Sequence, residues 1–272
     1  MRRYGRGRFF GVIALLTAVV ITGCGFLDSN VSEGRKEASV EEQFETLEKV
    51  KEKKKSVRKH IGKKKTICID PGHQVRQNSN KESVGPGSKE RKQKVSSGTA
   101  GVVTKVPEYK LNMVVSLKLK KELEYRGYRV VMTRMTDQTD ISNKERAEIT
   151  NNAKADAYIR IHADGAPSAS YNGVATYCMT KENPYNSYLY KQSYRLSNLI
   201  VTALAQSTGA KNNGVTERDT YTGNNWSKVP VTIVEMGFMS NPKEDRQMQT
   251  RSYQKKIVVG IANGVDRYLK KS

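Results

Sequence analysis

The chain has 272 residues, and its 48 Lys and Arg against 27 Asp and Glu give a formal net charge of +21 at pH 7. This length favours one catalytic domain with additional segments over several large domains, because single cores stop growing at roughly 250 to 300 residues. The charge indicates attraction to polyanions. Nucleic acid, anionic lipid and the anionic polymers of a bacterial wall all fit it, so the cellular compartment has to decide between them.

The first 24 residues have the plan of an export signal. Arginines at positions 2, 3, 6 and 8 precede an uncharged, mostly apolar run over residues 9–21. This run is shorter than the roughly 20 residues of a membrane-spanning helix, and it leads through small residues to Cys24. The segment resembles a lipoprotein signal, although Ile21 stands where Leu is usual, and the resemblance implies lipidation of Cys24. An uncleaved membrane anchor is the alternative, and both interpretations place the remaining chain outside the cytoplasm.

Residues 25–65 form a basic, low-complexity linker. Ser, Glu and Lys dominate it, and Lys49 to Lys65 is mostly Lys and Arg. Such a segment buries no core and is expected to be disordered or a solvated helix that serves as a spacer from the membrane. Its position next to the membrane favours binding to anionic lipid headgroups or wall polymers, whereas nucleic acid is not expected as a partner of an exported chain.

From Thr66 onward, β-rich and helical patterns alternate. Thr66 to Asp70 reads as the first strand, and it is followed by Pro71-Gly72-His73. Gln74 to Ser97 is long, polar and rich in Lys, Gly and Ser, which predicts a mobile surface loop; a segment that grips a substrate or covers a cleft is the alternative. A helix is expected to begin near Pro107, because Pro suits the first helical position, and to end at Gly127. Its apolar residues at helical spacing are Leu111, Val114, Val115, Leu119 and Leu123.

The remaining elements continue the alternation. Ser142 and Glu145 form a capping box for a helix that runs to about Asn152, and Gly209 closes a second long helix over about Tyr188 to Ser207. The expected strands are Tyr128 to Thr133, Ala157 to His162, Gly173 to Met179 and Val229 to Glu235, and Asn241-Pro242 opens a helical C-terminal region. This order predicts a single α/β domain over residues 66–272, with a mixed, mostly parallel twisted sheet flanked by helices on both faces.

Two cysteines besides Cys24 lie in apolar, strand-like runs. Cys68 and Cys178 are interpreted as buried thiols. An exported location also permits a disulfide between them, and the sequence leaves this open. Neither has the spacing of a zinc-binding cysteine pair.

Polar residues lie at the ends of three predicted strands. His73 follows the first strand, His162 closes another, and Glu235 closes the last. Ligand crevices in open α/β sheets lie outside the carboxyl ends of the strands, so these residues are expected to meet there, with Glu108 joining them from the start of a helix. Two imidazoles and one carboxylate are a common ligand set for catalytic zinc. The remaining carboxylate would then take a proton from the attacking water.

Four segments in chain order resemble a known family. They are Ile69-Asp70-Pro71-Gly72-His73, Val106-Pro107-Glu108-Tyr109-Lys110-Leu111-Asn112, Ile159-Arg160-Ile161-His162-Ala163 and Val234-Glu235-Met236-Gly237-Phe238-Met239-Ser240-Asn241. Together they look like the signature segments of the zinc-dependent N-acetylmuramoyl-L-alanine amidases of the type-3 family, and the resemblance covers essentially residues 66–269.

The resemblance implies roles for four residues. It implies that His73, Glu108 and His162 bind Zn2+ and that Glu235 is the catalytic carboxylate. The implied substrate is bacterial peptidoglycan, cut at the amide between N-acetylmuramic acid and the L-alanine of the stem peptide. Two positions depart from the family pattern, because Gln74 replaces the usual Gly and Asp164 replaces the common Asn. These departures put contacts with the substrate in doubt more than the metal.

Weaker substrate-binding candidates are Arg160, which alternates with two isoleucines beside His162, and Arg218, which lies in the predicted polar loop Asn212 to Asn225 before the last strand. Arg160 is expected either to orient a substrate carboxylate, to hold Glu235, or to point outward into solvent. Sugar rings stack on aromatic side chains, but packing is the favoured interpretation of Tyr177, Tyr221 and Trp226.

Other classes of function stay open on sequence alone. They are a peptidoglycan-binding or regulatory protein of the same fold that does not cut, a polyanion-binding surface protein, and a different exported zinc peptidase. The favoured interpretation is a monomeric amidase outside the cytoplasm, attached to the outer face of the membrane or to the wall.

Overall fold

The structure is a computed structural model that describes residues 64–270. The predicted export signal with Cys24, and the linker up to residue 63, lie outside the described residues. Within residues 64–270, no helix is both long enough and apolar enough to cross a membrane.

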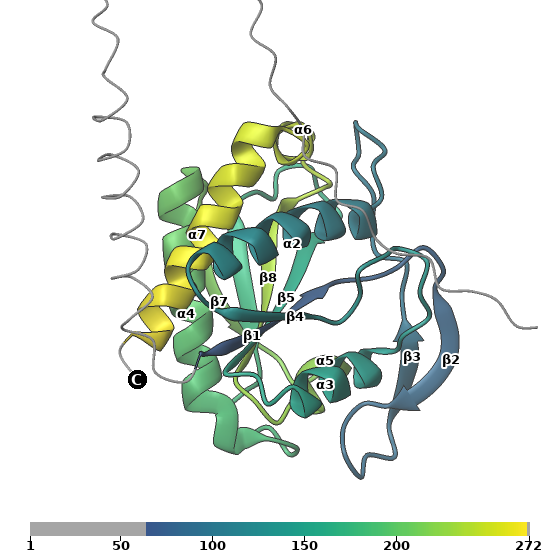
Figure 1. Ribbon diagram of the computed structural model, residues 1–272. Coiled ribbons are helices and arrows are strands. Elements are labelled where there is room, and N and C mark those ends of the chain that lie inside the picture. The colour runs from purple at the N-terminus through teal and green to yellow at the C-terminus, as the bar shows by residue number, and fades with distance from the viewer. Residues whose placement is uncertain (1–63, 271–272) are drawn as a thin grey trace, which may run out of the picture. The chain divides into compact units, whose positions relative to one another are not determined.

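A six-stranded sheet forms the centre of the domain (Figure 1). Its strands are β1 (Thr66–Pro71), β4 (Arg129–Met132), β5 (Ala157–Asp164), β6 (Val174–Cys178), β7 (Asn212–Glu217) and β8 (Val231–Phe238), in the order β4-β1-β5-β8-β6-β7. Only β6 runs antiparallel to its neighbour β8, and the other pairs are parallel. The prediction of a mixed, mostly parallel sheet in an α/β domain is therefore confirmed.

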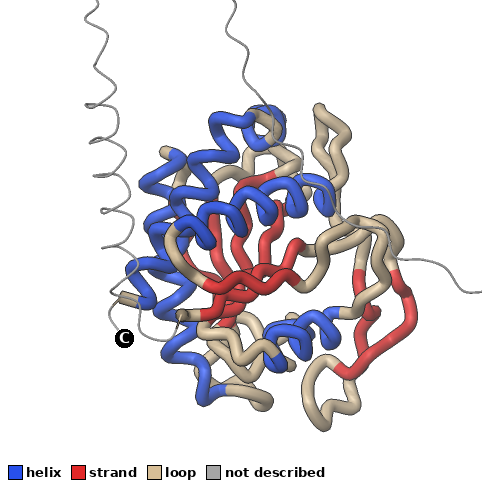
Figure 2. Tube along the Cα trace, viewed as in Figure 1, coloured by secondary structure: helices blue, strands red, loops and turns tan. Residues whose placement is uncertain are grey.

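Helices lie on both faces of the sheet (Figure 2). One face is covered by α2 (Glu108–Tyr125), which contacts β1, β4 and β5, and by α4 (Tyr190–Thr208), which contacts β6, β7 and β8; α7 (Arg251–Leu269) packs on both helices. The other side of the domain carries α3 (Asn143–Asn152) and α5 (Thr222–Asn225). The remaining helical turns are η1 (Ser187–Leu189) and α6 (Pro242–Met248).

The alternation of side chains along β5 separates the core from the site. Ile159 and Ile161 are fully buried in the main hydrophobic core with residues of α2, α4 and α7. Successive side chains of a strand point to opposite faces, so Tyr158, Arg160 and His162 share the other face. The packed helix layer therefore fixes the strand that presents His162.

The two cysteines of the described chain are free and buried, and no disulfide joins them. Cys68 and Cys178 lie in a smaller hydrophobic cluster that also contains Tyr158 and Val231. Burial raises the pKa of each thiol to about 12. They are thus unreactive packing residues, as the first of the two interpretations expected.

The prediction of a loop over Gln74 to Ser97 is wrong. The segment contains an antiparallel hairpin of β2 (Asn78–Ser83) and β3 (Arg91–Val95). Its strands are polar and mostly exposed, so they lack the alternation of apolar and polar residues that marks a strand in sequence. β7 was missed for the same reason, because its residues are polar and its edge position leaves them largely exposed.

Two of the predicted helix caps are confirmed, and the predicted start of α2 differs by one residue. The capping box of α3 is present, with the Ser142 Oγ accepting from the Glu145 backbone N–H (3.1 Å) and the Glu145 carboxylate accepting from the Ser142 N–H (2.7 Å). Gly209 ends α4 in the left-handed conformation, with φ of 76°. Pro107 is the N-cap of α2 and not its first residue. Val114, expected on the buried side of α2, is 43% exposed.

Candidate functional site

The structure brings the four principal candidates together. His73 follows β1, and Glu108 is the first residue of α2. His162 in β5 and Glu235 in β8 are paired neighbours across the two parallel strands. All four line one cavity of about 330 Å³. The expectation that these side chains meet is correct in its geometry, although β5 and β8 do not end at His162 and Glu235 but continue to Asp164 and Phe238.

Glu108 lies between the two imidazoles. Its Oε2 is 3.2 Å from His73 Nε2, and its Oε1 is 3.1 Å from His162 Nδ1. The ligand atoms of the three residues all lie within 4.8 Å of one another. Donors that share one tetrahedral zinc at roughly 2.0–2.1 Å are about 3.3 Å apart, so this set fits a single ion. We call these three residues the metal centre.

The protonation states of the metal centre also suit a cation. Burial lowers the pKa of His162 to about 4, so its imidazole is neutral at pH 7. Burial alone would raise the pKa of Glu108, but hydrogen bonds with His162 and His73 outweigh it and hold that pKa well below its usual range. A neutral imidazole and an ionised carboxylate are the forms that bind metal ions.

A strained turn presents His73. This residue has φ of 60°, a left-handed conformation that is unusual for a residue with a side chain. Arg134 donates to the carbonyl of Gly72 (3.1 Å), and Arg146 donates to that of His73 (3.1 Å). A Cβ on Gly72 would lie 2.2 Å from the His162 ring, so only glycine lets the turn approach that histidine.

Other polar groups orient the proposed ligands. His73 Nδ1 lies 2.9 Å from the Ser96 carbonyl, and this hydrogen bond orients the imidazole ring so that Nε2 faces Glu108. Glu108 accepts from the Thr99 N–H (3.0 Å), the Asn112 side-chain amide (3.0 Å) and the Ala163 N–H (3.2 Å). The sequence interpretation gave these residues no role. The position of Asn112, four residues after Glu108 on the same face of the helix, could have indicated its contact with Glu108. Nothing in the sequence indicated a role for Ser96, because it lies in a segment that was interpreted as a loop.

Glu235 lies outside the metal centre but within the same cavity. Its Oε2 is buried and has no hydrogen-bond partner among the described residues. Burial, with the negative charges of Glu108 and Asp164, raises the pKa of Glu235 well above its usual range, and Arg160 only partly opposes this. A carboxyl group with a raised pKa is a stronger base once it is ionised, which is what proton transfer requires.

Arg160 is held within the protein. Its side chain is 4% exposed, and it donates to Asp70 (2.9 Å), Asn143 (2.7 Å) and Asn224 (3.5 Å). It lines the cavity, so the expectation of an outward, solvated arginine is wrong. Its charge reaches Glu235 across the cavity. A direct contact of Arg160 with substrate stays a prediction.

Arg218 follows β7 and is exposed, with its guanidinium carbon 6.0 Å from the centre of the Tyr177 ring. It is not among the residues that line the cavity of the metal centre, and a role in substrate binding stays a prediction. Tyr221 lines that cavity, and its ring centre is 5.7 Å from that of Tyr177. Trp226 donates to the Ser83 carbonyl (2.9 Å) and packs under Lys144, as the packing interpretation expected.

The two departures from the family pattern differ in their surroundings. Gln74 is fully buried and bonded to Arg146 (3.0 Å) and Asp140 (3.3 Å), so it supports the turn and does not face substrate. Asp164 lines the cavity, accepts from the Tyr177 hydroxyl (3.4 Å), and has a pKa raised by burial.

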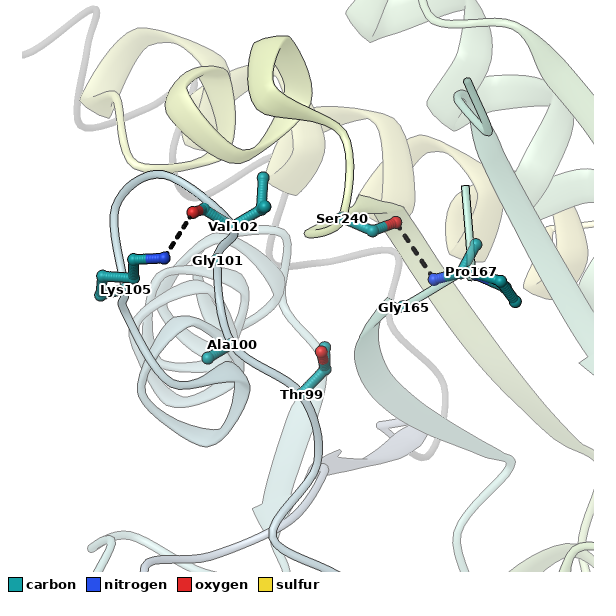
Figure 3. Close-up of a pocket in the computed structure, with 9 residues that line it drawn as sticks. Thr99, Ala100, Gly101, Val102, Lys105, Gly165, Pro167 and Ser240 are labelled. Atoms are coloured by element: carbon teal, nitrogen blue, oxygen red, sulfur yellow. Dashed lines mark hydrogen bonds between the residues drawn. The ribbon is translucent and has the colours of Figure 1, made fainter. Parts of the chain in front are cut away.

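A second cavity of about 640 Å³ shares a lining residue with the first, and Figure 3 shows the residues that line this second cavity. Gly165 lines both cavities. Thr99, whose N–H binds Glu108, lines the second one and lies across from Gly165 and Pro167 in Figure 3. The two cavities thus extend the site from the metal centre along the surface. An extended site of this kind suits a polymeric substrate more than a small molecule.

Comparison with known proteins identifies relatives of this fold and site. The family model described as N-acetylmuramoyl-L-alanine amidase matches residues 67–267. The N-acetylmuramoyl-L-alanine amidase LytC of Bacillus subtilis (strain 168) is 29% identical over 75% of this chain and 35% of LytC. The probable cell wall amidase LytH of Staphylococcus aureus is 28% identical over 75% of this chain and 58% of LytH. The chain therefore spans only about a third to just over half of these two relatives.

A solved structure resembles this one in fold and sequence. The crystal structure of the N-acetylmuramyl-L-alanine amidase Ami1 from Mycobacterium smegmatis superposes with a TM-score of 0.70 and 26% identity. The match covers 76% of this chain and 98% of the Ami1 chain. It agrees with the single α/β domain described above.

Proposed function

This chain belongs to the N-acetylmuramoyl-L-alanine amidase family, and from this premise we propose that it is a zinc-dependent peptidoglycan amidase. Its substrate bond is the amide between the lactyl group of N-acetylmuramic acid and the L-alanine of the stem peptide. One observation carries the proposal: two imidazoles and a carboxylate with metal-ligand spacing share a cavity with a separate buried carboxylate of raised pKa.

His73, Glu108 and His162 would hold the ion, and their buried donors are already oriented for it by Ser96 and Asn112. A bound zinc ion polarises a carbonyl and lowers the pKa of water to roughly 7. Because metal binding takes the negative charge of Glu108, the cavity needs a second carboxylate for proton transfer.

Glu235 would supply that second carboxylate. It accepts a proton from the attacking water as the water oxygen bonds to the amide carbon. It then delivers the proton to the amide nitrogen as the carbon–nitrogen bond breaks. The products are a free muramic acid carboxyl group and a stem peptide with an L-alanine amine. Arg160, held by Asp70, keeps a positive charge near Glu235 and limits how far the pKa of Glu235 rises.

We place this activity outside the cytoplasm, at the membrane surface or in the wall. Two points support the proposal: the export signal that the sequence predicts for residues 1–24, and the similarity to LytH, a probable cell wall amidase. Lipidation of Cys24, binding of residues 25–65 to anionic lipid or wall polymers, and a monomeric state belong to the same proposal.

The products of digestion test the proposed activity. Purified peptidoglycan is incubated with the protein, and new N-terminal L-alanine amines and new reducing sugar ends are measured separately. We expect new L-alanine amines without new reducing ends, because only the amide is cut. New reducing ends would instead indicate a glycosidase. Binding to peptidoglycan with no new ends of either kind would favour a regulatory protein of the same fold that does not cut.

A further inference from the structure

The sheet face that carries Glu235 continues to the edge of the sheet. Strand pairing sets Ala175 of β6 opposite Glu235, and Thr216 of β7 opposite Tyr177. Paired residues project to the same face of a sheet, as do residues two apart on one strand. The floor of the cavity that contains the metal centre, which we call the catalytic cavity, therefore continues toward β7 through Ala175, Tyr177 and Thr216.

The helix layer lies on the opposite face at this point. Thr176, which lies between Ala175 and Tyr177, donates to the carbonyl of Ser197 on α4 (3.2 Å). Since side chains alternate along β6, Ala175 and Tyr177 point away from α4. No helix of that layer covers the floor there.

An open pocket of about 350 Å³ lies on this continuation, which we call the aromatic pocket. Three of its walls are the rings of Tyr171, Tyr177 and Phe238, and its floor includes Ala175 and Thr216. Tyr171 is 55% exposed although its ring centre lies 5.9 Å from that of Phe238, at an angle of 41°. A small-molecule site occupies about 300–1,000 Å³, so the aromatic pocket is large enough for one.

Hydrogen bonds to the backbone fix the segments that carry the Tyr171 and Phe238 rings. Asn241 donates to the carbonyls of Ala169 (2.9 Å) and Tyr171 (3.2 Å), which anchors the loop that carries Tyr171. The Phe238 N–H donates to the buried Glu244 carboxylate (2.8 Å). The exposed ring is therefore part of a fixed surface, which lowers the entropic cost of binding.

The aromatic pocket adjoins the catalytic cavity. The Tyr177 hydroxyl is 3.4 Å from the Asp164 carboxylate, and Asp164 lines the cavity that contains the metal centre. A polymer whose bond is cut at the metal centre thus has its next unit within reach of these rings.

The rim of the aromatic pocket is polar. It carries Asn172, Asn213 and Lys211, all exposed, and the Asn213 amide donates to the Asn172 carbonyl (2.8 Å). The face of an aromatic ring is partly negative and attracts the slightly positive C–H groups of a sugar face, while amides and an ammonium group bind hydroxyl and acetamido groups. Lys211 is the one cationic side chain among the residues that line the pocket, and Arg218 lies beside the Tyr177 ring, which is fewer positive charges than an acidic peptide would require.

We propose that the aromatic pocket binds a sugar ring of the glycan strand, adjacent to the muramic acid whose amide is cut. This inference rests on the proposed function. It also assigns the path of the bound glycan strand, which runs from the metal centre across β6 toward β7. The enzyme then prefers stem peptides that are attached to a glycan chain over those on a single sugar.

A kinetic comparison tests this preference. The ratio of kcat/KM on glycan strands to kcat/KM on a single muramoyl peptide is measured for the wild type, Tyr171→Ala and Tyr171→Phe. Loss of one stacking ring corresponds to about a tenfold loss of affinity, so we expect the ratio to fall about tenfold in Tyr171→Ala and to recover in Tyr171→Phe. Tyr125→Ala is the matched control, since Tyr125 is 84% exposed and lies on α2; its ratio should equal that of the wild type.

A binding measurement separates this inference from the proposed activity, because it requires no turnover. The full chain carrying Glu235→Gln is titrated with a tetramer of N-acetylglucosamine and, separately, with a free tetrapeptide stem. Binding of the sugar that weakens about tenfold on adding Tyr171→Ala supports the aromatic pocket, whether or not the wild type cuts an amide. An unchanged ratio in the kinetic test, or weakened binding of the stem peptide but not of the sugar, overturns it.

Discussion

Replacing Glu235 by Gln is expected to lower turnover on peptidoglycan by about 10³-fold, within the range of about 10²–10⁴ for loss of general acid–base catalysis. The amide side chain keeps the size of the carboxylate but accepts no proton at neutral pH. Metal binding should not change, because Glu235 lies outside the group of His73, Glu108 and His162. The measurement is release of L-alanine amines together with the zinc content of the purified protein.

A surface carboxylate provides the control for this substitution. Glu148→Gln removes a charge from α3, where the side chain is 45% exposed and paired with Lys144 at 3.6 Å, and it should leave turnover unchanged. If Glu235→Gln retained more than a tenth of the wild-type turnover, Glu235 would not be the proton-transfer group. Loss of zinc in Glu235→Gln would instead show that Glu235 is a ligand.

Replacing Asp70 by Asn is expected to cost about 3–5 kcal/mol of unfolding free energy, the usual loss when one partner of a buried ion pair is removed. Asp70 is fully buried and accepts from Arg146 at 2.7 Å and Arg160 at 2.9 Å. The substitution leaves two buried guanidinium groups without their counter-ion. Because Arg146 also supports the turn at His73, the site is expected to loosen as well.

The effect of Asp70 depends on pH with a definite sign. Burial alone would raise its pKa, but the charges of Arg146 and Arg160 and a hydrogen bond from Thr133 outweigh it and hold the pKa well below its usual range. The unfolded carboxyl has a pKa of about 3.9, so the stabilisation is fully present above that pH. It is lost progressively as the pH falls below it.

Denaturant unfolding at several pH values checks both statements. The difference in unfolding free energy between the wild type and Asp70→Asn should be largest at neutral pH and shrink below about pH 4. The control is Asp156→Asn, which removes the charge paired with Lys65 but keeps a side-chain oxygen for the Thr66 N–H, and it should cost no more than about 1 kcal/mol. A difference between the wild type and Asp70→Asn that grew toward acid would contradict the assigned direction of the pKa shift.

The fold and the centre of the site were predictable because local patterns carry them. Apolar periodicity marks the helices and the buried strands, and strand ends in an α/β sheet share one edge. His73, His162 and Glu235 were therefore placed together before any coordinates. Glu108 was expected to join them from the start of a helix, and the resemblance to the amidase family then implied its role as a ligand.

The groups that orient the site were not predictable, since their partners come from distant parts of the chain. Ser96 reaches His73 from a polar hairpin that has no strand periodicity. Arg160 is buried by Asp70, Asn143 and Asn224, which come from three separate elements or loops. The aromatic pocket depends on the edge strand β7, and its exposed polar sequence was interpreted as a loop.

Metal titration tests the central claim most directly. The full chain is stripped with a chelator and titrated with Zn2+ while bound metal and release of L-alanine amines are followed, for the wild type, His162→Ala and His60→Ala. The chain has three histidines, and His60 is the one that does not belong to the metal centre, so its substitution is a matched control for the change from His to Ala.

We predict that one equivalent of zinc restores full activity to the wild type and to His60→Ala. In His162→Ala, loss of a ligand should weaken zinc binding by at least about 100-fold, beyond the usual effect of losing a group that only orients a ligand, and abolish amine release. Amide cleavage that persists in the stripped wild-type protein, or equal zinc affinity in His162→Ala and His60→Ala, would contradict a metal centre of His73, Glu108 and His162.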